Sequence, residues 1–185
     1  IEDASHSLGA KHFIEPVGSC KWSDITVFSF HPVKIITTGE GGMATTNNKK
    51  YSDQMKIFLS NGIVKDSKLF KFKKKNQPWY YEYQKTGFNY RMNEISASIG
   101  ISQLSRLKGF LKKRNNIAKL YKKILDKLFI RYQKINKYNF SSYHLFVIQF
   151  DLKKTKFSYL KIFKKLRSKN YFVNLHYMPL HLSPY

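Results

Sequence analysis

The apolar positions in the first third of the chain predict short strands joined by glycine-rich turns. Residues 25–30 read Ile-Thr-Val-Phe-Ser-Phe, and this β-branched and aromatic run predicts a buried strand. Pro32 ends that strand, because proline cannot donate a hydrogen bond to a sheet. Residues 39–42 are rich in glycine and predict a turn, after which Met43 begins a second strand that runs to Thr46.

Helices are predicted where an asparagine precedes apolar residues at helical spacing. Asn47 and Asn48 can cap the first helix, whose apolar positions are Tyr51, Met55, Phe58 and Leu59. Asn93 can cap a longer helix that starts at Glu94 and keeps apolar steps of three, four or seven residues as far as Leu128. A helix of this length is a candidate connection between two domains.

The remaining segments predict an insertion and a smaller folded unit. Residues 65–86 are polar and rich in lysine, and they show no clear period. After the long helix, the pattern predicts a strand at 145–150, a helix at 157–169 and a strand at 171–175. This order of strands and helices favours an α/β or α+β fold.

The composition allows a packed core and gives the chain a strong positive charge. Apolar residues make up 42% of the 185 residues, and 34 Lys and Arg against 11 Asp and Glu give a net charge of +23. Lys, Asn, Ile, Phe and Tyr all have codons rich in A and T, so a genome-wide base bias explains this composition without a nucleic-acid partner. The densest run, Lys65 to Lys75, carries no RNA-binding or zinc-finger signature. A basic nucleic-acid-binding module stays open as the non-enzyme alternative.

The cysteine content and the start of the chain bear on its location. Cys20 is the only cysteine, which excludes an intramolecular disulfide and fits a reducing cytoplasm. No run approaches the roughly 18 apolar residues of a membrane span, and Ile1-Glu2-Asp3 does not begin a signal peptide. We therefore expect a cytoplasmic protein without a membrane partner. Because the first residue is not Met, we also expect an internal piece of a longer protein.

Four residues offer the functional groups that pyridoxal-phosphate (PLP) chemistry requires. Lys34, on a tight loop after Pro32, could form an imine with the cofactor and move a proton between carbons. Asp3 could keep the pyridine nitrogen protonated, and His6 could approach the same face of the ring. Ser29 offers a hydroxyl to the phosphate. Each residue alone is commonly structural or solvated, so only the combination points to this cofactor.

Three strings carry a resemblance to a known family, namely EDASHSLGA, SDITVFSFHPVKIITTGEGGMATTN and GFNYRMNEISASIGISQL. They closely resemble the DegT/DnrJ/StrS family of sugar-nucleotide aminotransferases, and the resemblance covers nearly the whole chain. It implies the α/β PLP-dependent transferase fold type I, as in aspartate aminotransferase. Residues 1–112 would be the C-terminal part of the large PLP-binding domain, and residues 113–185 a truncated small α/β domain. Roughly as much chain again would precede Ile1, and a short piece would follow Tyr185.

The resemblance also implies roles for individual residues. Lys34 matches the lysine that forms the Schiff base, and Asp3 matches the acid paired with the pyridine nitrogen. His6 matches the position beside the ring hydroxyl of the cofactor, and Ser29 matches a phosphate-binding hydroxyl. Asn89 matches a residue that reaches the phosphate of the neighbouring subunit, which implies a homodimer with a shared active site.

Three segments bear on the substrate class: the EDASH string at residues 2–6, the PWYYE string at residues 78–82 and the ending at residues 173–185. They resemble family members that aminate a UDP-4-keto-6-deoxy-N-acetyl-hexosamine in pseudaminic acid biosynthesis, which implies glutamate as the amino donor. His176 and Tyr177 match a segment near the sugar nucleotide.

Several alternatives stay open. The substrate could be another nucleotide-linked keto sugar, and the chain could be an inactive fragment. A sugar dehydratase of the same fold would carry histidine in place of Lys34, which argues against that reaction. No metal site is predicted, because His176 and His181 do not share one helical face and a third ligand is not evident.

Overall fold

The structure is a computed structural model that describes residues 1–72, 77–128 and 130–184. It divides into two compact units, of which unit 1 comprises residues 1–120 and 134–146 and unit 2 comprises residues 121–133 and 147–185. Among the described residues, no helix combines the length and the apolarity that crossing a bilayer requires.

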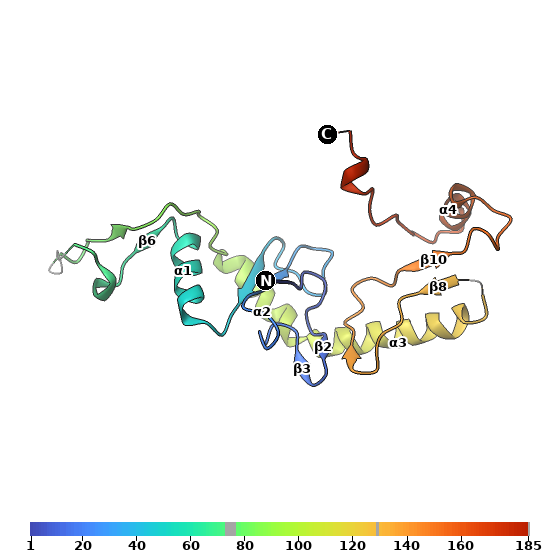
Figure 1. Cartoon of the computed structure of the whole chain (residues 1–185), viewed down its shortest axis with the longest axis horizontal. Helices are drawn as coiled ribbons and strands as arrows, with labels where there is room; N and C mark the ends of the chain where they lie inside the picture. The colour runs from blue at the N-terminus through green and yellow to red at the C-terminus, as the bar shows by residue number, and fades with distance from the viewer. Residues whose placement is uncertain (73–76, 129, 185) are drawn as a thin grey trace. The chain divides into compact units, whose positions relative to one another are not determined.

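Most of the regular elements belong to unit 1. Figure 1 colours them in order of residue number. In chain order they are β1 (Glu2–Asp3), β2 (Lys11–His12), β3 (Glu15–Pro16), β4 (Thr26–Ser29), β5 (Gly42–Thr45), α1 (Lys49–Leu59), β6 (Ile63–Val64), a 3-10 helix (Ser67–Leu69), β7 (Glu82–Tyr83), α2 (Glu94–Ser105) and β9 (Asn139–Phe140). The helix α3 (Leu107–Leu125) begins in unit 1 and ends in unit 2. Unit 2 also contains β8 (Ile130–Tyr132), β10 (Ile148–Phe150), α4 (Tyr159–Ser168) and a 3-10 helix (Leu180–Leu182).

The central sheet of unit 1 has β4 in the middle, as the apolar run at residues 25–30 predicted. β1 pairs with β4 in parallel, with Glu2 opposite Thr26 and Asp3 opposite Val27. β5 pairs with β4 in antiparallel fashion, so the strand predicted to begin at Met43 is confirmed and starts one residue earlier. The sheet order is therefore β1-β4-β5.

One face of this sheet carries the core of unit 1. The buried cluster consists of Ala4, Phe28, Phe30, Ile35 and Ile36. Burying a large apolar side chain of this kind contributes about 1.5–3 kcal/mol. Val27 belongs to the opposite face, because side chains alternate along a strand, and it is 38% exposed. The loop that holds Ile35 and Ile36 is thus fixed to the buried face of the sheet by its own apolar side chains.

The long helix predicted from Glu94 is interrupted, and this part of the prediction was wrong. α2 ends at Ser105, and α3 begins at Leu107 after a single turn residue, Arg106. The Arg106 backbone N–H donates to Gln103 O at 3.1 Å, which is a tighter turn than an α-helix makes. The Ser105 hydroxyl donates to Ser102 O at 2.8 Å, and such bonds compete with the helical ladder. Because the turn is only one residue long, the apolar residues of α3 continue nearly the same helical spacing as those of α2. The periodicity of the sequence therefore does not reveal the break.

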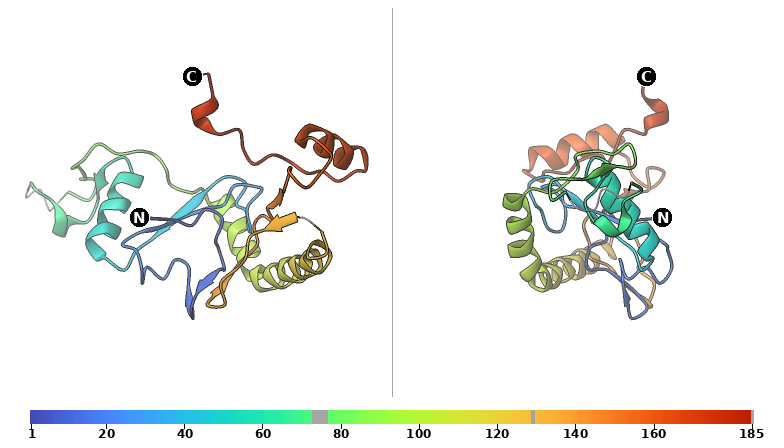
Figure 2. Two further views of the ribbon diagram at one scale, coloured as in Figure 1. Left: turned by 45° about the vertical axis from the view of Figure 1, so that its right-hand side comes forward. Right: turned by 90° about the vertical axis from the view of Figure 1, so that its left-hand side faces the viewer.

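In unit 2 the strand-helix pattern is partly confirmed. β10 lies within the predicted strand 145–150, and α4 lies within the predicted helix 157–169. β10 pairs with β8, a strand that was not predicted (Figure 2). Gln149 lies opposite Arg131 in this pair. The strand predicted at residues 171–175 is wrong, because that segment pairs with no strand in the described part of the chain. Its backbone instead bonds locally, with the Tyr171 N–H donating to Leu166 O at 3.1 Å.

Within the insertion predicted at residues 65–86, one buried carboxylate accepts hydrogen bonds from several residues. Glu82 is 6% exposed. Its carboxylate accepts from the backbone N–H groups of Lys71 and Phe72, both at 2.8 Å. The Gln84 amide donates to it at 2.7 Å and the Tyr80 hydroxyl at 3.2 Å. Burial alone would raise the pKa of Glu82, but these donors outweigh it and hold that pKa below its usual range.

Replacing Glu82 by Gln is expected to lower the unfolding midpoint by several degrees at pH 7, because the amide cannot accept four hydrogen bonds in this arrangement. The depressed pKa means that the carboxylate stabilises the fold above pH about 4.3, and that this stabilisation is lost as pH falls below that value. Thermal unfolding from pH 7 to pH 3 should therefore show the gap between wild type and Glu82→Gln closing in acid. Glu40→Gln, at an exposed glutamate, is the matched control. A constant gap at every pH would contradict this role of Glu82.

Candidate functional site

The loop after β4 presents Lys34 on a short turn that closes on Phe30. The Phe30 N–H donates to Gly41 O at 2.8 Å, and the Thr38 N–H donates to Phe30 O at 3.0 Å. Within the loop, the Lys34 N–H donates to His31 O at 2.9 Å. Lys34 is partly exposed, whereas the two residues that follow it are buried. The loop is thus anchored on both sides of a lysine whose side chain remains accessible.

Asp3 and Ser29 belong to the same face of the sheet. Asp3 is the last residue of β1 and lies opposite Val27, and Ser29 follows Val27 by two residues on β4. Because side chains alternate along a strand, these residues share the face opposite to the buried Phe28. The parallel pairing of β1 with β4 therefore brings together a carboxylate and a hydroxyl that are 26 positions apart in the chain.

Ser5 stabilises the ionised form of the Asp3 carboxylate. The Ser5 hydroxyl donates to Asp3 Oδ1 at 2.6 Å, and its backbone N–H donates to the same oxygen at 3.0 Å. These bonds, helped by the positive charges of His6 and Lys34, hold the pKa of Asp3 below its usual range. The charge of Lys34 acts on this pKa in the same direction and is the weakest of these influences.

His6 lies on the turn that follows β1, and its imidazole contacts a second imidazole. The ring centroids of His6 and His144 are 4.3 Å apart, with their planes tilted by 57°. The Ser29 hydroxyl oxygen accepts from the His31 N–H at 3.4 Å. Ser5 and His144 were not identified from the sequence. Ser5 could have been, because an aspartate side chain commonly bonds to the backbone two residues further along the chain.

Asn89 is exposed and lies on a segment that runs along the end of α1. The Phe88 N–H donates to Phe58 O at 2.7 Å, and the Tyr90 N–H donates to Leu59 O at 3.1 Å. The rings of Phe88 and Tyr90 stack with centroids 4.9 Å apart. The backbone on both sides of Asn89 is therefore fixed, and its side chain faces solvent in the single chain.

His176 and Tyr177 belong to unit 2, and their ring centroids are 3.9 Å apart. Their place relative to Asp3 and Lys34 of unit 1 stays a prediction.

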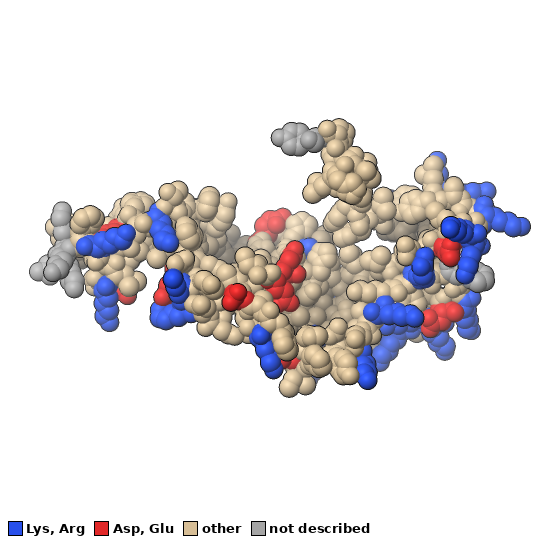
Figure 3. Space-filling view, in the orientation of Figure 1, with Lys and Arg blue, Asp and Glu red and all other residues tan. Residues whose placement is uncertain are grey.

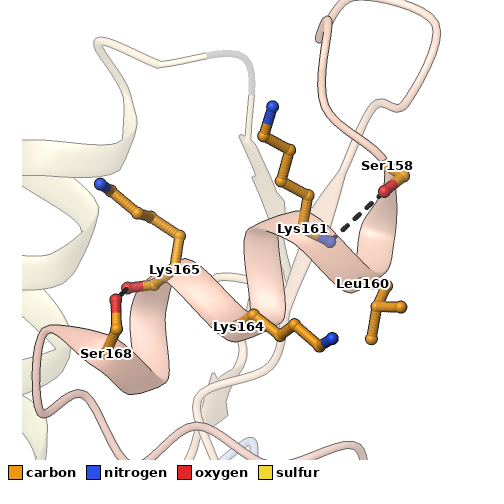
Figure 4. A pocket seen from close by; sticks show the side chains of 6 residues that line it. All are labelled: Ser158, Leu160, Lys161, Lys164, Lys165 and Ser168. Atoms are coloured by element: carbon orange, nitrogen blue, oxygen red, sulfur yellow. Dashed lines mark hydrogen bonds between the residues drawn. The ribbon is translucent and has the colours of Figure 1, made fainter.

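A shallow groove on the surface of unit 2 is lined by α4 and its N-cap residue (Figure 4). Its walls are Ser158, Leu160, Lys161, Lys164, Lys165 and Ser168. The two serine hydroxyls bond to the backbone of the same helix, with Ser158 Oγ accepting from the Lys161 N–H at 3.3 Å and Ser168 Oγ donating to Lys165 O at 2.9 Å. The lysines form the solvated side of an amphipathic helix, and the groove contains none of the predicted site residues.

The basic side chains are spread over many elements. On the face shown in Figure 3 they cover parts of both units, with acidic side chains between them. Among the described residues, no group of three or more His, Cys, Asp and Glu side chains is placed to hold a metal ion.

The sheet face that carries Asp3 and Ser29 has the functional groups that PLP requires. It offers an ionised carboxylate for the pyridine nitrogen and a hydroxyl for the phosphate, and the loop that follows β4 adds the amine of Lys34. The exposed Val27 between them leaves this face open to a planar ring. The residues present therefore fit the cofactor.

Comparison with known proteins identifies the family. The DegT/DnrJ/EryC1/StrS aminotransferase family matches residues 1–185. The chain belongs to this family. It is 37% identical to UDP-4-amino-4,6-dideoxy-N-acetyl-beta-L-altrosamine transaminase of Campylobacter jejuni over 97% of the chain and 44% of that protein. It is also 37% identical to an uncharacterized protein of Methanocaldococcus jannaschii, over 100% of the chain and 47% of that protein.

Solved structures of this aminotransferase family confirm the fold class. Helicobacter pylori PseC, an aminotransferase involved in the biosynthesis of pseudoaminic acid, matches with a TM-score of 0.82 and 30% identity over 98% of the chain and 46% of PseC. The Streptococcus pneumoniae sugar aminotransferase Spr1654, solved in its PLP-form, matches with a TM-score of 0.80 and 27% identity over 98% of the chain and 44% of Spr1654. The chain spans about half the length of the relatives it matches, and it carries part of the PLP-dependent transferase fold type I.

Proposed function

We propose that the protein is a PLP-dependent aminotransferase that aminates a UDP-4-keto-6-deoxy-N-acetyl-hexosamine in pseudaminic acid biosynthesis, with glutamate as the amino donor. The observation that carries this proposal is the shared face of Asp3 and Ser29 beside Lys34, in a chain 37% identical to the C. jejuni transaminase. A cytoplasmic location is part of the proposal, since nucleotide sugars and a reduced Cys20 both suit that compartment.

The roles of the residues follow from their chemistry. PLP, when bound, supplies an electron-accepting ring that stabilises negative charge on the substrate carbon. Asp3 would hold the pyridine nitrogen protonated through its ionised carboxylate, and Ser29 would donate to the phosphate. Lys34 would hold the cofactor covalently and would then carry a proton at Nζ between the reacting carbon of the substrate and the cofactor. His6 would lie beside the ring hydroxyl, and His176 and Tyr177 would contact the sugar nucleotide.

The reaction can be tested directly on the purified protein at its natural length. Incubation with PLP, glutamate and the UDP-4-keto sugar should yield the 4-amino sugar and 2-oxoglutarate in equal amounts. A parallel series with GDP- and dTDP-linked keto sugars examines the alternative that another nucleotide sugar is the substrate. Failure to form any amino sugar while PLP is bound would contradict the proposed activity.

The division into domains is part of the same proposal. Residues 1–112 would form the C-terminal part of the large domain and residues 113–185 the small domain, with the boundary inside α3.

A homodimer with a shared active site would give Asn89 its role. Asn89 is exposed in the single chain, and α2 exposes apolar side chains, with Ile95 77%, Ile101 72% and Leu104 53% exposed. Exposed apolar side chains grouped on one helix are typical of surfaces that another chain covers. In a two-fold symmetric dimer, each site would combine Lys34 of one subunit with Asn89 of the other.

Mixing two inactive variants tests this arrangement. Lys34→Ala and Asn89→Asp should each be nearly inactive alone, since the first lacks the amine and the second places a negative charge beside the phosphate. Dimers that contain one subunit of each should carry one fully wild-type site, so random mixing should restore roughly a quarter of wild-type activity. Sedimentation should show a dimer. No recovery from a mixture shown to exchange subunits, or a fully active monomer, would contradict the shared site.

A further inference from the structure

A segment far along the chain packs against the turn that carries Asp3 and His6. Residues 141–144 lie about 140 positions after this turn, and we call them the 141–144 clamp. The Ser142 hydroxyl donates to His6 O at 3.2 Å, and the His144 ring lies 4.3 Å from the His6 ring between centroids. Ser142 is 2% exposed, so this hydrogen bond is shielded from water. The clamp therefore contacts both the backbone and the side chain of His6.

The helix α3 holds the clamp in place through two polar side chains. Arg114 Nη1 donates to Tyr143 O at 3.0 Å and to His144 O at 3.3 Å. Asn115 Nδ2 donates to Ser141 O at 3.1 Å. Within the clamp, the Tyr143 N–H donates to Ser141 Oγ at 3.1 Å. These bonds fix the backbone on either side of Ser142 and at His144 itself.

The clamp restricts the orientation of the His6 ring. His6 is exposed, and the orientation of its imidazole is set by two side-chain torsions that neighbouring groups can restrict. His144 lies against that imidazole at a tilt of 57°. Arg114 donates a hydrogen bond to the backbone carbonyl of His144. Because this bond fixes the backbone, the His144 ring can act as a fixed support for the His6 ring.

We propose that His144 is a positioning residue for His6, holding its imidazole in the orientation in which it meets the cofactor. The role beside the cofactor rests on the proposed function, whereas the orientation itself is a property of the chain. The clamp thereby couples α3 to the cofactor face of the sheet. A loss of the His144 ring should widen the range of orientations of the His6 imidazole without altering Asp3, Ser29 or Lys34.

The test uses the protein at its natural length with ¹³C-labelled histidine and no cofactor. In His144→Ala, the His6 imidazole resonance should shift, and its line should sharpen as the ring becomes more mobile. In His144→Phe, which keeps an aromatic ring on the same backbone, the resonance should stay restricted. His12→Ala is the control for losing a different imidazole of unit 1, whose ring lies 5.6 Å from that of Trp22 between centroids and bonds to Asn139 rather than to a residue of the clamp.

PLP affinity provides the second measurement. Losing an aromatic pair of this kind should weaken PLP binding by about two- to tenfold in His144→Ala, with His144→Phe and His12→Ala close to wild type. Ser142→Ala, which removes only the hydroxyl, should also shift the His6 resonance and provides a milder variant if His144→Ala fails to fold.

The two measurements separate the proposals. A wild-type protein that does not bind PLP would contradict the proposed function, while the resonance of His6 would still decide whether the clamp orients it. An unmoved His6 resonance in both His144→Ala and Ser142→Ala would overturn the positioning role. Equal loss of PLP affinity in His144→Phe and His144→Ala would do so too.

Discussion

Replacing Lys34 by Ala is expected to abolish covalent attachment of the cofactor and to lower the amination rate by at least about 10²–10⁴-fold, the range typical of losing a positioned proton-transfer group. Lys34 lies on a turn that is closed by its own N–H donating to His31 O, and the buried Ile35 and Ile36 follow it. Alanine leaves those anchors in place, so the fold should be preserved. The loss should therefore appear in the chemistry and not in the unfolding temperature.

Borohydride reduction followed by peptide mapping measures the attachment. In the wild-type protein the pyridoxyl label should appear on the peptide that contains Lys34, and in Lys34→Ala it should be absent. Lys49→Ala is the matched control, because Lys49 lies at the exposed start of α1, where its ion pair with Asp53 adds little stability. A label on another lysine of the wild type, or near-normal turnover of Lys34→Ala, would refute the assignment.

The part of the fold around Lys34 could be predicted because its signals are local. The apolar run at residues 25–30 correctly predicted β4. Asn48 and Asn93 were correctly predicted as the N-caps of α1 and α2. In each case a short string contains both the pattern and its physical cause. The Asn93 side chain, for example, accepts from the Ser96 N–H at 2.8 Å.

The errors have physical reasons that the sequence conceals. The turn at Arg106 inserts a single residue between α2 and α3. This shifts the helical spacing of the apolar residues too little for the break to be recognised from the sequence. β8 has the apolar-polar-apolar order of a strand at Ile130–Tyr132, but it directly follows a helix whose pattern extends to Leu128. Residues 171–175 have the composition of a strand, yet a strand forms only where a neighbour can pair with it. Pairing partners are a property of the fold and cannot be deduced from a single segment.

The candidate site also contains residues that the sequence predicted and a residue that it did not. The structure places Asp3 and Ser29 on one sheet face, with Lys34 on the loop that follows β4, an arrangement that depends on the parallel pairing of β1 with β4. His144 could not be found from the sequence, because its contact with His6 depends on how α3 holds a distant segment. Residues that act through another residue leave no local pattern.

Asp3→Asn is expected to lower the amination rate by about 10²–10³-fold, as is usual when a preorganised electrostatic group is removed from a catalytic site. Asparagine is nearly the same size and can still accept from Ser5, so β1 and its pairing with β4 should be kept. What is lost is the negative charge that would hold the pyridine nitrogen protonated. The effect should therefore fall on kcat, with thermal unfolding unchanged within a few degrees.

Ser5→Ala separates the charge of Asp3 from its hydrogen bonds. Removing the Ser5 hydroxyl should raise the pKa of Asp3 toward its ordinary value of about 3.9, because that hydroxyl is the main cause of the lowered pKa. The carboxylate would still be ionised at pH 7, so the rate of Ser5→Ala should stay far closer to wild type than that of Asp3→Asn. Below pH about 4, Ser5→Ala should lose activity at a higher pH than wild type, since its carboxylate takes up a proton sooner. Rates measured from pH 3.5 to pH 8 compare the three proteins. Equal losses in Asp3→Asn and Ser5→Ala at pH 7 would show that Asp3 acts through its local hydrogen bonds, and its role as the acid paired with the cofactor would have to be abandoned.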